Sequence, residues 1–334
     1  MSHFDSLIKP IDEKELKRYR NIFKESLKNA KKSEKLHPTP TGSGFLVCHL
    51  FNMAYNAVHQ RDEELLDQLY NEHEAIKPGD ENFRHHIDFN RACLRITQHR
   101  FEEAIEMFEA LEATGIRLHR SHILHYLVDI NAHLENYKAA APWVHKYLAY
   151  WEIDNGGRCS YANYSGLGRL LSILAQAGEF ESVIKYGLTR INQKYPKEQY
   201  LHFLVAQSYL NLKDVKNALK YYSYIFKRKV PYPEAYVNLG DYYYVEERNL
   251  DTAIKYLIKA IKACGTDPDF KRLLADIYNN IGLFYKWLED PKKAAKYRRE
   301  MFEAMGNPVL LSDLAALFMR DRGSMEEYRA WLGD

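Results

Sequence analysis

The sequence predicts an all-α fold: a solenoid of about seven antiparallel helix hairpins with atypical helices at both ends. Two helix–turn–helix segments lie next to each other between residues 199 and 264, and Gly240 in the second follows Ala206 in the first by 34 positions. A fixed period of this length is typical of helical repeat arrays. Apolar residues also recur at helical spacing, as in Phe101, Ile105, Phe108 and Leu111. Each helix therefore has one face to bury.

Small residues recur in pairs, and two helices approach closely only where such residues lie at their crossing. The members of a pair are 12 residues apart in five pairs and 13 apart in the Gly240 pair, whose turn is one residue longer. The pairs are Ala92/Ala104, Val128/Ala140, Leu171/Val183, Ala206/Ala218, Gly240/Ala253 and Gly282/Ala294. They predict six hairpins, of which the Leu171/Val183 hairpin fits least well because neither residue is small. A seventh is expected in residues 45–73.

The hairpins are expected to form one continuous unit, because each buries its apolar face against the next. We place this solenoid at residues 45–305, after an N-terminal basic helix and Pro/Gly linker at residues 1–44. Residues 306–334 would form capping helices over the last hairpin. Two insertions lengthen the repeat: a loop around residues 151–163, and residues 265–269, where Asp267 and Pro268 are typical of a helix start.

The segments YVNLGDYYY with AIKYLIKAI, and YNNIGLFY with AAKYRREMF, resemble the tetratricopeptide repeat family. In that family a large residue, a Leu–Gly pair and a Tyr mark the first helix, and an Ala opens the packing face of the second. The corresponding residues are Tyr236, Leu239, Gly240, Tyr243 and Ala253, and then Tyr278, Ile281, Gly282, Tyr285 and Ala294. The resemblance is concentrated in residues 199–305. It implies a right-handed superhelical solenoid and specifies no activity.

The composition is that of a soluble chain, with 46% hydrophobic and 28% charged residues. No apolar run approaches the roughly 20 residues that span a bilayer, and the N-terminus has no apolar signal region. The four cysteines lack paired spacing, which favours reduced thiols and a cytoplasmic location. A net charge of +2 argues against a specific nucleic-acid partner.

Positive charge is concentrated in residues 9–35, which contain ten Lys and Arg residues and five Asp and Glu residues. The simpler interpretation is the solvated face of an end helix. The alternative is a docking element for an acidic partner or an anionic surface. The sequence leaves both open.

Histidine is concentrated as well, since twelve of the 14 lie between His37 and His145. His122, His125 and Asp129 follow helical spacing and share one stripe of a helix. Such residues on adjacent turns can bind a metal. A helix that lines a groove needs polar residues there in any case, so we expect no metal ion and no cofactor. A metal-binding or enzymatic role for this stripe is one alternative.

Catalytic motifs are not found, so we expect a protein that is not an enzyme. The loop TGSG lacks the lysine of a phosphate-binding loop. The segment SGLGR lacks a third glycine, and Ser165 lacks the upstream glycine of a nucleophile elbow.

The first helices of stacked hairpins line a concave groove, and one stripe of each defines the candidate binding residues. These are His86, Phe89, His122, His125, Asp129, Tyr200, Phe203, Gln207, Glu234, Asp241, Tyr244 and Asp276. The stripe is rich in histidine at its start and in acidic residues and tyrosine at its end. Carboxylates at that end favour a basic ligand.

The favoured function is a non-catalytic scaffold or adaptor that binds a peptide segment of a partner protein, preferably a basic one. A peptide-responsive regulatory sensor is a second alternative. Some members of the resembling family hold the terminal carboxylates of chaperones with cations on successive first helices. Asn90 and Asn238 match the central asparagine of that clamp, but the expected cations are replaced by His122, Tyr126, Asp276 and Asn280. We therefore predict that the chain is not a carboxylate-clamp protein.

Overall fold

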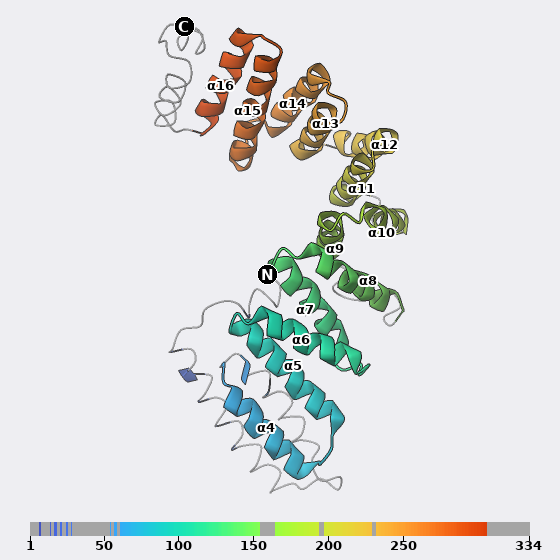
Figure 1. Ribbon diagram of the computed structural model, residues 1–334, viewed down its shortest axis with the longest axis vertical. Coiled ribbons are helices and arrows are strands. Elements are labelled where there is room, and N and C mark those ends of the chain that lie inside the picture. Colours follow the sequence, from blue (N-terminus) through green and yellow to red (C-terminus); the bar gives the residue numbers. More distant parts are fainter. Residues whose placement is uncertain are drawn as a thin grey trace. The chain divides into compact units, whose positions relative to one another are not determined.

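The computed structural model describes residues 61–153, 164–193, 197–228 and 232–305, with isolated positions 7, 14, 17, 18, 21, 25, 28, 54, 57 and 58. Within these residues the chain is all-α, as the sequence predicts, and no strand occurs among them. By its contacts the chain divides into two compact units, Met1–Gly178 and Glu179–Asp334. Each unit is described by itself (Figure 1).

The first unit contains six of the labelled helices. They are α4 (Glu63–Ile76), α5 (Glu81–Thr97), α6 (Phe101–Ala113), α7 (Arg120–His133), α8 (Tyr137–Ile153) and α9 (Tyr164–Gln176). The side chains of Asp62 and Asp80 accept hydrogen bonds from backbone N–H groups at the starts of α4 and α5. Such caps satisfy donors that the helix itself leaves unpaired.

The described residues of the second unit form seven helices and one short 3-10 turn. They are α10 (Phe180–Gln193), α11 (Gln199–Asn211), α12 (Val215–Phe226), α13 (Pro233–Val245), α14 (Leu250–Cys264), η1 (Pro268–Phe270), α15 (Lys271–Trp287) and α16 (Pro291–Met305). Asp267 caps η1, with Pro268 as its first residue, so the expected helix start is a 3-10 turn leading directly into α15. This turn accounts for part of the longer spacing between Gly240 and Gly282.

Most of the predicted crossing residues lie at packed helix pairs. Consecutive helices pack as α5/α6, α7/α8, α11/α12, α13/α14 and α15/α16. At these pairs, Ala92, Ala104, Ala206, Ala218 and Ala253 have no exposed surface. The fourth expected hairpin falls across the two units, with Leu171 in α9 of the first and Val183 in α10 of the second. The number of hairpins stays a prediction.

The glycine at the α13/α14 crossing is required by the closeness of the two helices. A Cβ atom at Gly240 would lie 3.0 Å from Cγ and Cδ2 of Leu257 and 3.4 Å from the carbonyl oxygen of Ala253. At Gly282 the nearest atom is Cγ of Arg298, at 3.1 Å. The two helices can approach this closely only without a side chain at the crossing.

Apolar packing also extends upstream of α4. Ala54 and Ala57 pack in one cluster with Leu66 and Leu69 of α4 and Phe83 of α5. This cluster lies where the seventh hairpin is predicted, although most of residues 45–60 fall outside the described part of the chain.

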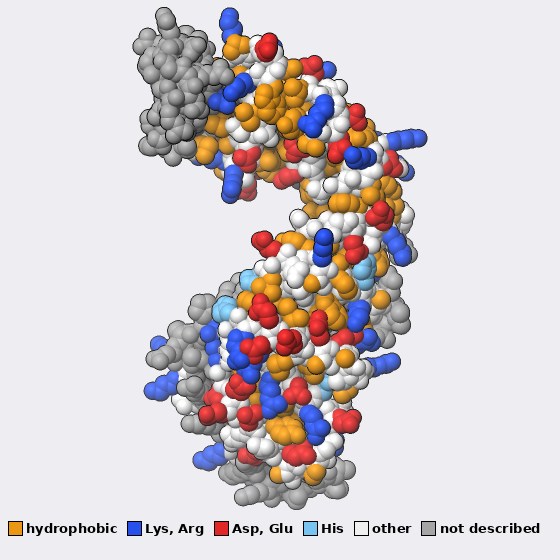
Figure 2. Space-filling model, in the orientation of Figure 1, with side chains coloured by type: hydrophobic (Ala, Val, Ile, Leu, Met, Phe, Trp, Pro, Cys, Tyr) orange, Lys and Arg blue, Asp and Glu red, His pale blue; other side chains and the backbone are white. Residues whose placement is uncertain are grey.

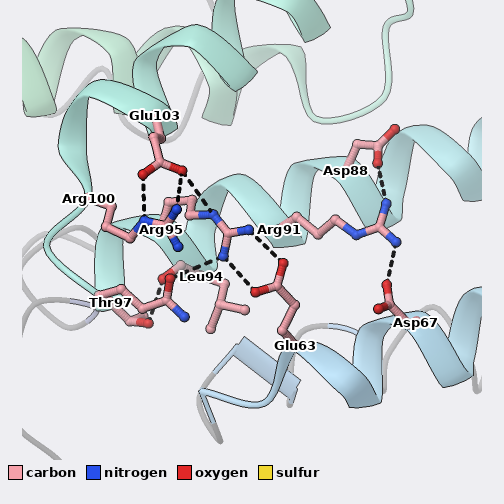
Figure 3. A network of polar contacts seen from close by, with 10 residues as sticks. Glu63, Asp67, Asp88, Arg91, Leu94, Arg95, Thr97, Arg100 and Glu103 are labelled. Carbon is pink, nitrogen blue, oxygen red and sulfur yellow. Dashed lines mark hydrogen bonds and ion pairs between the residues drawn. The ribbon is translucent and has the colours of Figure 1, made fainter.

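In the first unit, ion pairs join α4 to α5 (Figure 3). Arg95 of α5 donates to Glu63 of α4 at 2.6 and 2.8 Å, and Arg91 donates to Asp67 of α4 at 2.6 Å. Hydrogen bonding from Arg95 holds the pKa of Glu63 below its ordinary value. These contacts join α4 to α5 along their charged edges.

Among the described residues, each unit has one cysteine, and it is buried. Cys93 of α5 is 3% exposed and Cys264 of α14 is 2% exposed. Burial raises the pKa of Cys93, and it raises the pKa of Cys264 to about 11. Neither sulfur is therefore a thiolate at neutral pH.

Several predicted features lie outside the described residues. They are most of the basic segment at residues 9–35, the loop at residues 154–163 and the C-terminal segment at residues 306–334. The proposed division at residues 1–44, 45–305 and 306–334 therefore stays a prediction. No helix within the described ranges is long and apolar enough to cross a membrane.

Candidate functional site

In the first unit, two predicted groove residues of α5 pack against the start of α7. His86 Nδ1 lies 2.6 Å from His119 Nε2, and the Phe89 ring stacks on the His119 ring at a centroid distance of 4.2 Å. His86 and Phe89 are each 7% exposed. These two side chains hold α5 against α7 and offer little surface to a ligand.

His119 was not singled out by the sequence, yet it is central to this cluster. It precedes α7 with a φ of 61°, in the left-handed region. Burial lowers its pKa to about 3, with further lowering by His86 and His122. At neutral pH the His119 ring in this contact is therefore uncharged.

The other predicted residues of this unit lie along α7. Asp129 is buried, and its Oδ2 lies 3.2 Å from Nε2 of His125, one turn earlier. Its Oδ1 lies 2.8 Å from Nη1 of Arg169 on α9. The carboxylate thus joins two first helices of the array. Arg169 was missed because no local pattern shows which residue of a later helix faces a buried Asp.

The geometry of this stripe does not form a metal site. Burial lowers the pKa of His125, although Asp129 opposes that effect. His122 is exposed. Across the described ranges, no group of three His, Cys, Asp or Glu residues is arranged to hold a metal ion. Oδ1 of Asp129 is engaged by Arg169, and Oδ2 lies beside Nε2 of His125.

In the second unit, the predicted aromatic residues of α11 form part of a ring cluster. The ring centroids of Tyr200 and Phe203 are 6.3 Å apart, and Phe203 lies 5.0 Å from Tyr232. Tyr200, Phe203 and Gln207 are all half-buried. They are partly accessible, and Tyr232 immediately precedes α13, so this surface continues toward the next first helix.

The predicted acidic residues lie on α13 and α15. Glu234 is half-buried, whereas Asp241 and Asp276 are exposed. Desolvation by surrounding side chains still raises the pKa of the Asp241 carboxyl above its ordinary value. Figure 2 shows apolar side chains gathered over α13 to α15, with charged side chains around them.

Three other carboxylates of the same unit have a cation, whereas these three have none among the described residues. Ion pairs of the second unit join Lys213 to Glu246, Lys293 to Asp290 and Arg299 to Glu303. None of the ion pairs between described residues involves Glu234, Asp241 or Asp276.

Tyr244, the last predicted residue of α13, contacts α15 through two rings. Its centroid lies 5.5 Å from that of Trp287, in a stacked arrangement, and 4.7 Å from that of Phe284. Trp287 is 51% exposed, whereas Phe284 is 3% exposed. The sequence did not single out Trp287 for binding. The signal was its place on the stripe that carries Asp276, 11 residues or about three helical turns earlier.

The chain is similar in sequence to one known family. A model of the tetratricopeptide repeat family matches residues 89–157 and 203–268. The first match runs from within α5 to beyond α8, and the second from within α11 to beyond α14. They include four of the crossing pairs described above. A comparison with curated proteins gives no match.

A comparison with solved structures gives matches at low sequence identity, of which three follow. The crystal structure of the MamA protein is 18% identical, with 56% of this chain and 92% of that chain covered and a TM-score of 0.39. The crystal structure of the APC/C hetero-tetramer Cut9-Hcn1 is 16% identical, covering 87% and 52% with a TM-score of 0.34. The apo form of the quorum sensor NprR from B. thuringiensis is 15% identical, covering 86% and 85% with a TM-score of 0.39.

The matched residues, their antiparallel helix pairs and the small residues at each crossing agree on one type of repeat. Over residues 89–157 and 203–268 this chain is similar to the tetratricopeptide repeat family.

Proposed function

We propose that this chain is a non-catalytic protein–protein interaction scaffold or adaptor that binds a basic peptide segment of a partner protein. The ligand would lie along the first helices of the hairpins, with its basic residues on α13 and α15. A cytoplasmic location belongs to the same proposal.

The observation that carries this proposal is the set of three carboxylates without a cation. Glu234 is half-buried, Asp241 and Asp276 are exposed, and within the described residues no Lys or Arg forms an ion pair with them. A cationic ligand would be attracted to these unpaired carboxylates. A cation would also favour the ionised form of Asp241, whose pKa desolvation raises.

Two contacts support the prediction that the chain does not clamp a terminal carboxylate. The Asn90 side chain is 1% exposed and donates to the carbonyl oxygen of His86 at 2.7 Å. The Asn238 amide donates to the Tyr222 hydroxyl at 3.3 Å. Both amides that could take the central role are thus engaged within the fold.

The two alternatives have less support. A metal-binding or enzymatic role would use His122, His125 and Asp129, but Asp129 is already engaged by His125 and Arg169. A peptide-responsive sensor shares the binding surface proposed here and differs only in its output, for which no described contact provides a mechanism.

The test is affinity purification from the native host, with the full-length chain as bait, followed by crosslinking of the bound segment. We expect crosslinks to α13 and α15 from a segment of net positive charge. Capture should weaken strongly in the triple variant Glu234→Gln, Asp241→Asn and Asp276→Asn, and it should fall as salt rises.

A matched control neutralises three carboxylates of the same unit that already have cations. This control is Glu246→Gln, Asp290→Asn and Glu303→Gln, and it should bind like the unmodified protein. Equal loss in both triple variants would mean that net charge alone matters. An acidic bound segment, or crosslinks confined to the second helices, would overturn the proposal.

A further inference from the structure

We infer that Trp287 and Tyr244 form a binding site for an arginine side chain of the ligand. Trp287, the last residue of α15, is 51% exposed. Its ring stacks on Tyr244 of α13 with an interplanar angle of 17°, and both rings rest on the buried Phe284. This site rests on the proposed function, because it specifies which basic residue the groove accepts.

The rings of Trp287 and Tyr244 pack on a buried side chain, and the Trp287 ring is accessible to solvent. Phe284 lies 4.7 Å from Tyr244 and 5.7 Å from Trp287, measured between ring centroids. Its own 3% exposure shows that it belongs to the core. A large aromatic side chain held in place by packing loses little entropy on binding, which is why such residues are frequent in recognition sites.

Other aromatic rings of the second unit already have a cation from this chain. A Lys ammonium lies over Tyr221, Tyr256, Tyr285 and Tyr297 at distances of 5.4, 4.8, 5.0 and 5.8 Å from the ring centroids. Among the described Lys and Arg side chains, none lies over Trp287 or Tyr244. Trp is the side chain whose face attracts cations most strongly. Trp287, the only Trp among the described residues of this unit, is therefore open to a ligand.

The charge near these rings favours the same ligand. Tyr244 follows Asp241 by three residues on α13, so the carboxylate lies about one turn away on the same stripe, at roughly 4.5 Å along the helix axis. Trp287 shares its α15 stripe with Asp276. A cation over the rings would thus be close to a carboxylate without a described partner.

The shape of the site favours arginine over lysine. A guanidinium is planar and weakly hydrated, so it can stack on an indole while its edge donates to a carboxylate. A lysine ammonium is a compact and strongly hydrated charge. Lysine could satisfy Asp241, but it would gain less from the stacked rings.

The test uses the full-length protein and three fluorescein-labelled 12-residue peptides. In these peptides Arg, Lys or Gln alternates with Gly and Ser. Binding is measured by fluorescence anisotropy at low salt. We expect the Arg peptide to bind more tightly than the Lys peptide, and the Gln peptide not to bind. Trp287→Ala should raise the Kd of the Arg peptide about two- to five-fold, as expected for an exposed cation–π contact.

Two variants serve as controls. Leu288→Ala removes the neighbouring side chain, which is 40% exposed, and should leave every Kd unchanged. Trp287→Phe keeps an aromatic face and should restore most of the affinity for the Arg peptide. The effect of Trp287→Ala on the Lys peptide should be smaller than on the Arg peptide.

The outcomes separate this inference from the proposed function. If the acidic triple variant weakens both basic peptides while Trp287→Ala changes neither, the basic-peptide groove stands and the arginine site is overturned. If neither basic peptide binds the unmodified protein, both fail. A dimer of the free protein that Trp287→Ala dissociates would show that the rings contact a second copy, and it would also overturn the inference.

Discussion

Replacing Gly240 with alanine tests whether the crossing of α13 and α14 is as close as the structure shows. The new Cβ would lie 3.0 Å from Cγ and Cδ2 of Leu257, which has no exposed surface, and 3.4 Å from the backbone oxygen of Ala253. Leu257 lies in a buried cluster with Ile254, Ile277 and Ile281, so its side chain can shift only by displacing these neighbours. The helices must therefore separate.

Two opposing effects set the magnitude. Overpacking a core costs about 1–3 kcal/mol. Alanine in place of glycine inside a helix gains about 0.5–1 kcal/mol. The balance is a net destabilisation of about 1 kcal/mol, and Gly240→Leu should exceed it because further carbons meet the same neighbours.

Gly282→Ala is the matched control, since it places the same methyl group at the equivalent crossing. There the nearest atom is Cγ of Arg298 at 3.1 Å, part of a long side chain that can shift. The gain in helix propensity should then balance or exceed the cost, so that this variant is as stable as the unmodified protein or slightly more stable.

Thermal unfolding followed by far-UV circular dichroism measures both variants. A cost of about 1 kcal/mol lowers the melting temperature by about 2–4 °C in a unit of this size. Amide hydrogen exchange should place the loosening in α13 and α14. A Gly240→Ala protein that is as stable as the unmodified chain would refute the assignment of the crossing.

Two further predictions concern the first unit. Burial lowers the pKa of His119 from 6.5 to about 3. Between these pH values the unfolded chain binds a proton at His119 that the folded chain excludes. The free energy of unfolding is therefore highest above pH 6.5 and decreases as the pH falls toward 3. The urea midpoint should fall between pH 7 and pH 5, and less so in His119→Asn, because Asn tolerates the positive φ; parallel pH curves would contradict this. Asp129→Asn should cost about 1–3 kcal/mol by weakening buried charged hydrogen bonds, against little change for the more exposed Asp88→Asn. Equal unfolding midpoints for these two variants would count against a structural role for Asp129.

The repeat architecture could be predicted because it depends on spacing along the chain. A small residue on each helix at constant separation identifies the crossing, and Ala206 with Ala218 lies there without exposed surface. The same spacing does not specify how deeply the side chains on a neighbouring stripe of the helix are buried. Phe89 and His86 share the predicted groove stripe, but the turn before α7 brings His119 against them and buries both.

Contacts between successive first helices were not predictable for a related reason. Asp129 with Arg169, and Tyr244 with Trp287, are pairs from helices separated by an intervening helix. Their contact depends on the length of that helix and its turns. The pattern of residue types within either segment does not predict it. The sequence therefore indicates which residues share one stripe of a helix. It does not indicate which of them contact residues of another helix.

The two buried thiols give each unit its own reporter of opening. Cys93 lies in the first unit and Cys264 in the second, and both react with a thiol reagent only when the surrounding helices separate. With Cys48 and Cys159 changed to serine, labelling rates in the native state would yield the opening free energy of each unit from a single sample. Binding of a ligand to one unit would then slow the labelling of that unit's cysteine, and any change at the other cysteine would measure how strongly the two units are coupled.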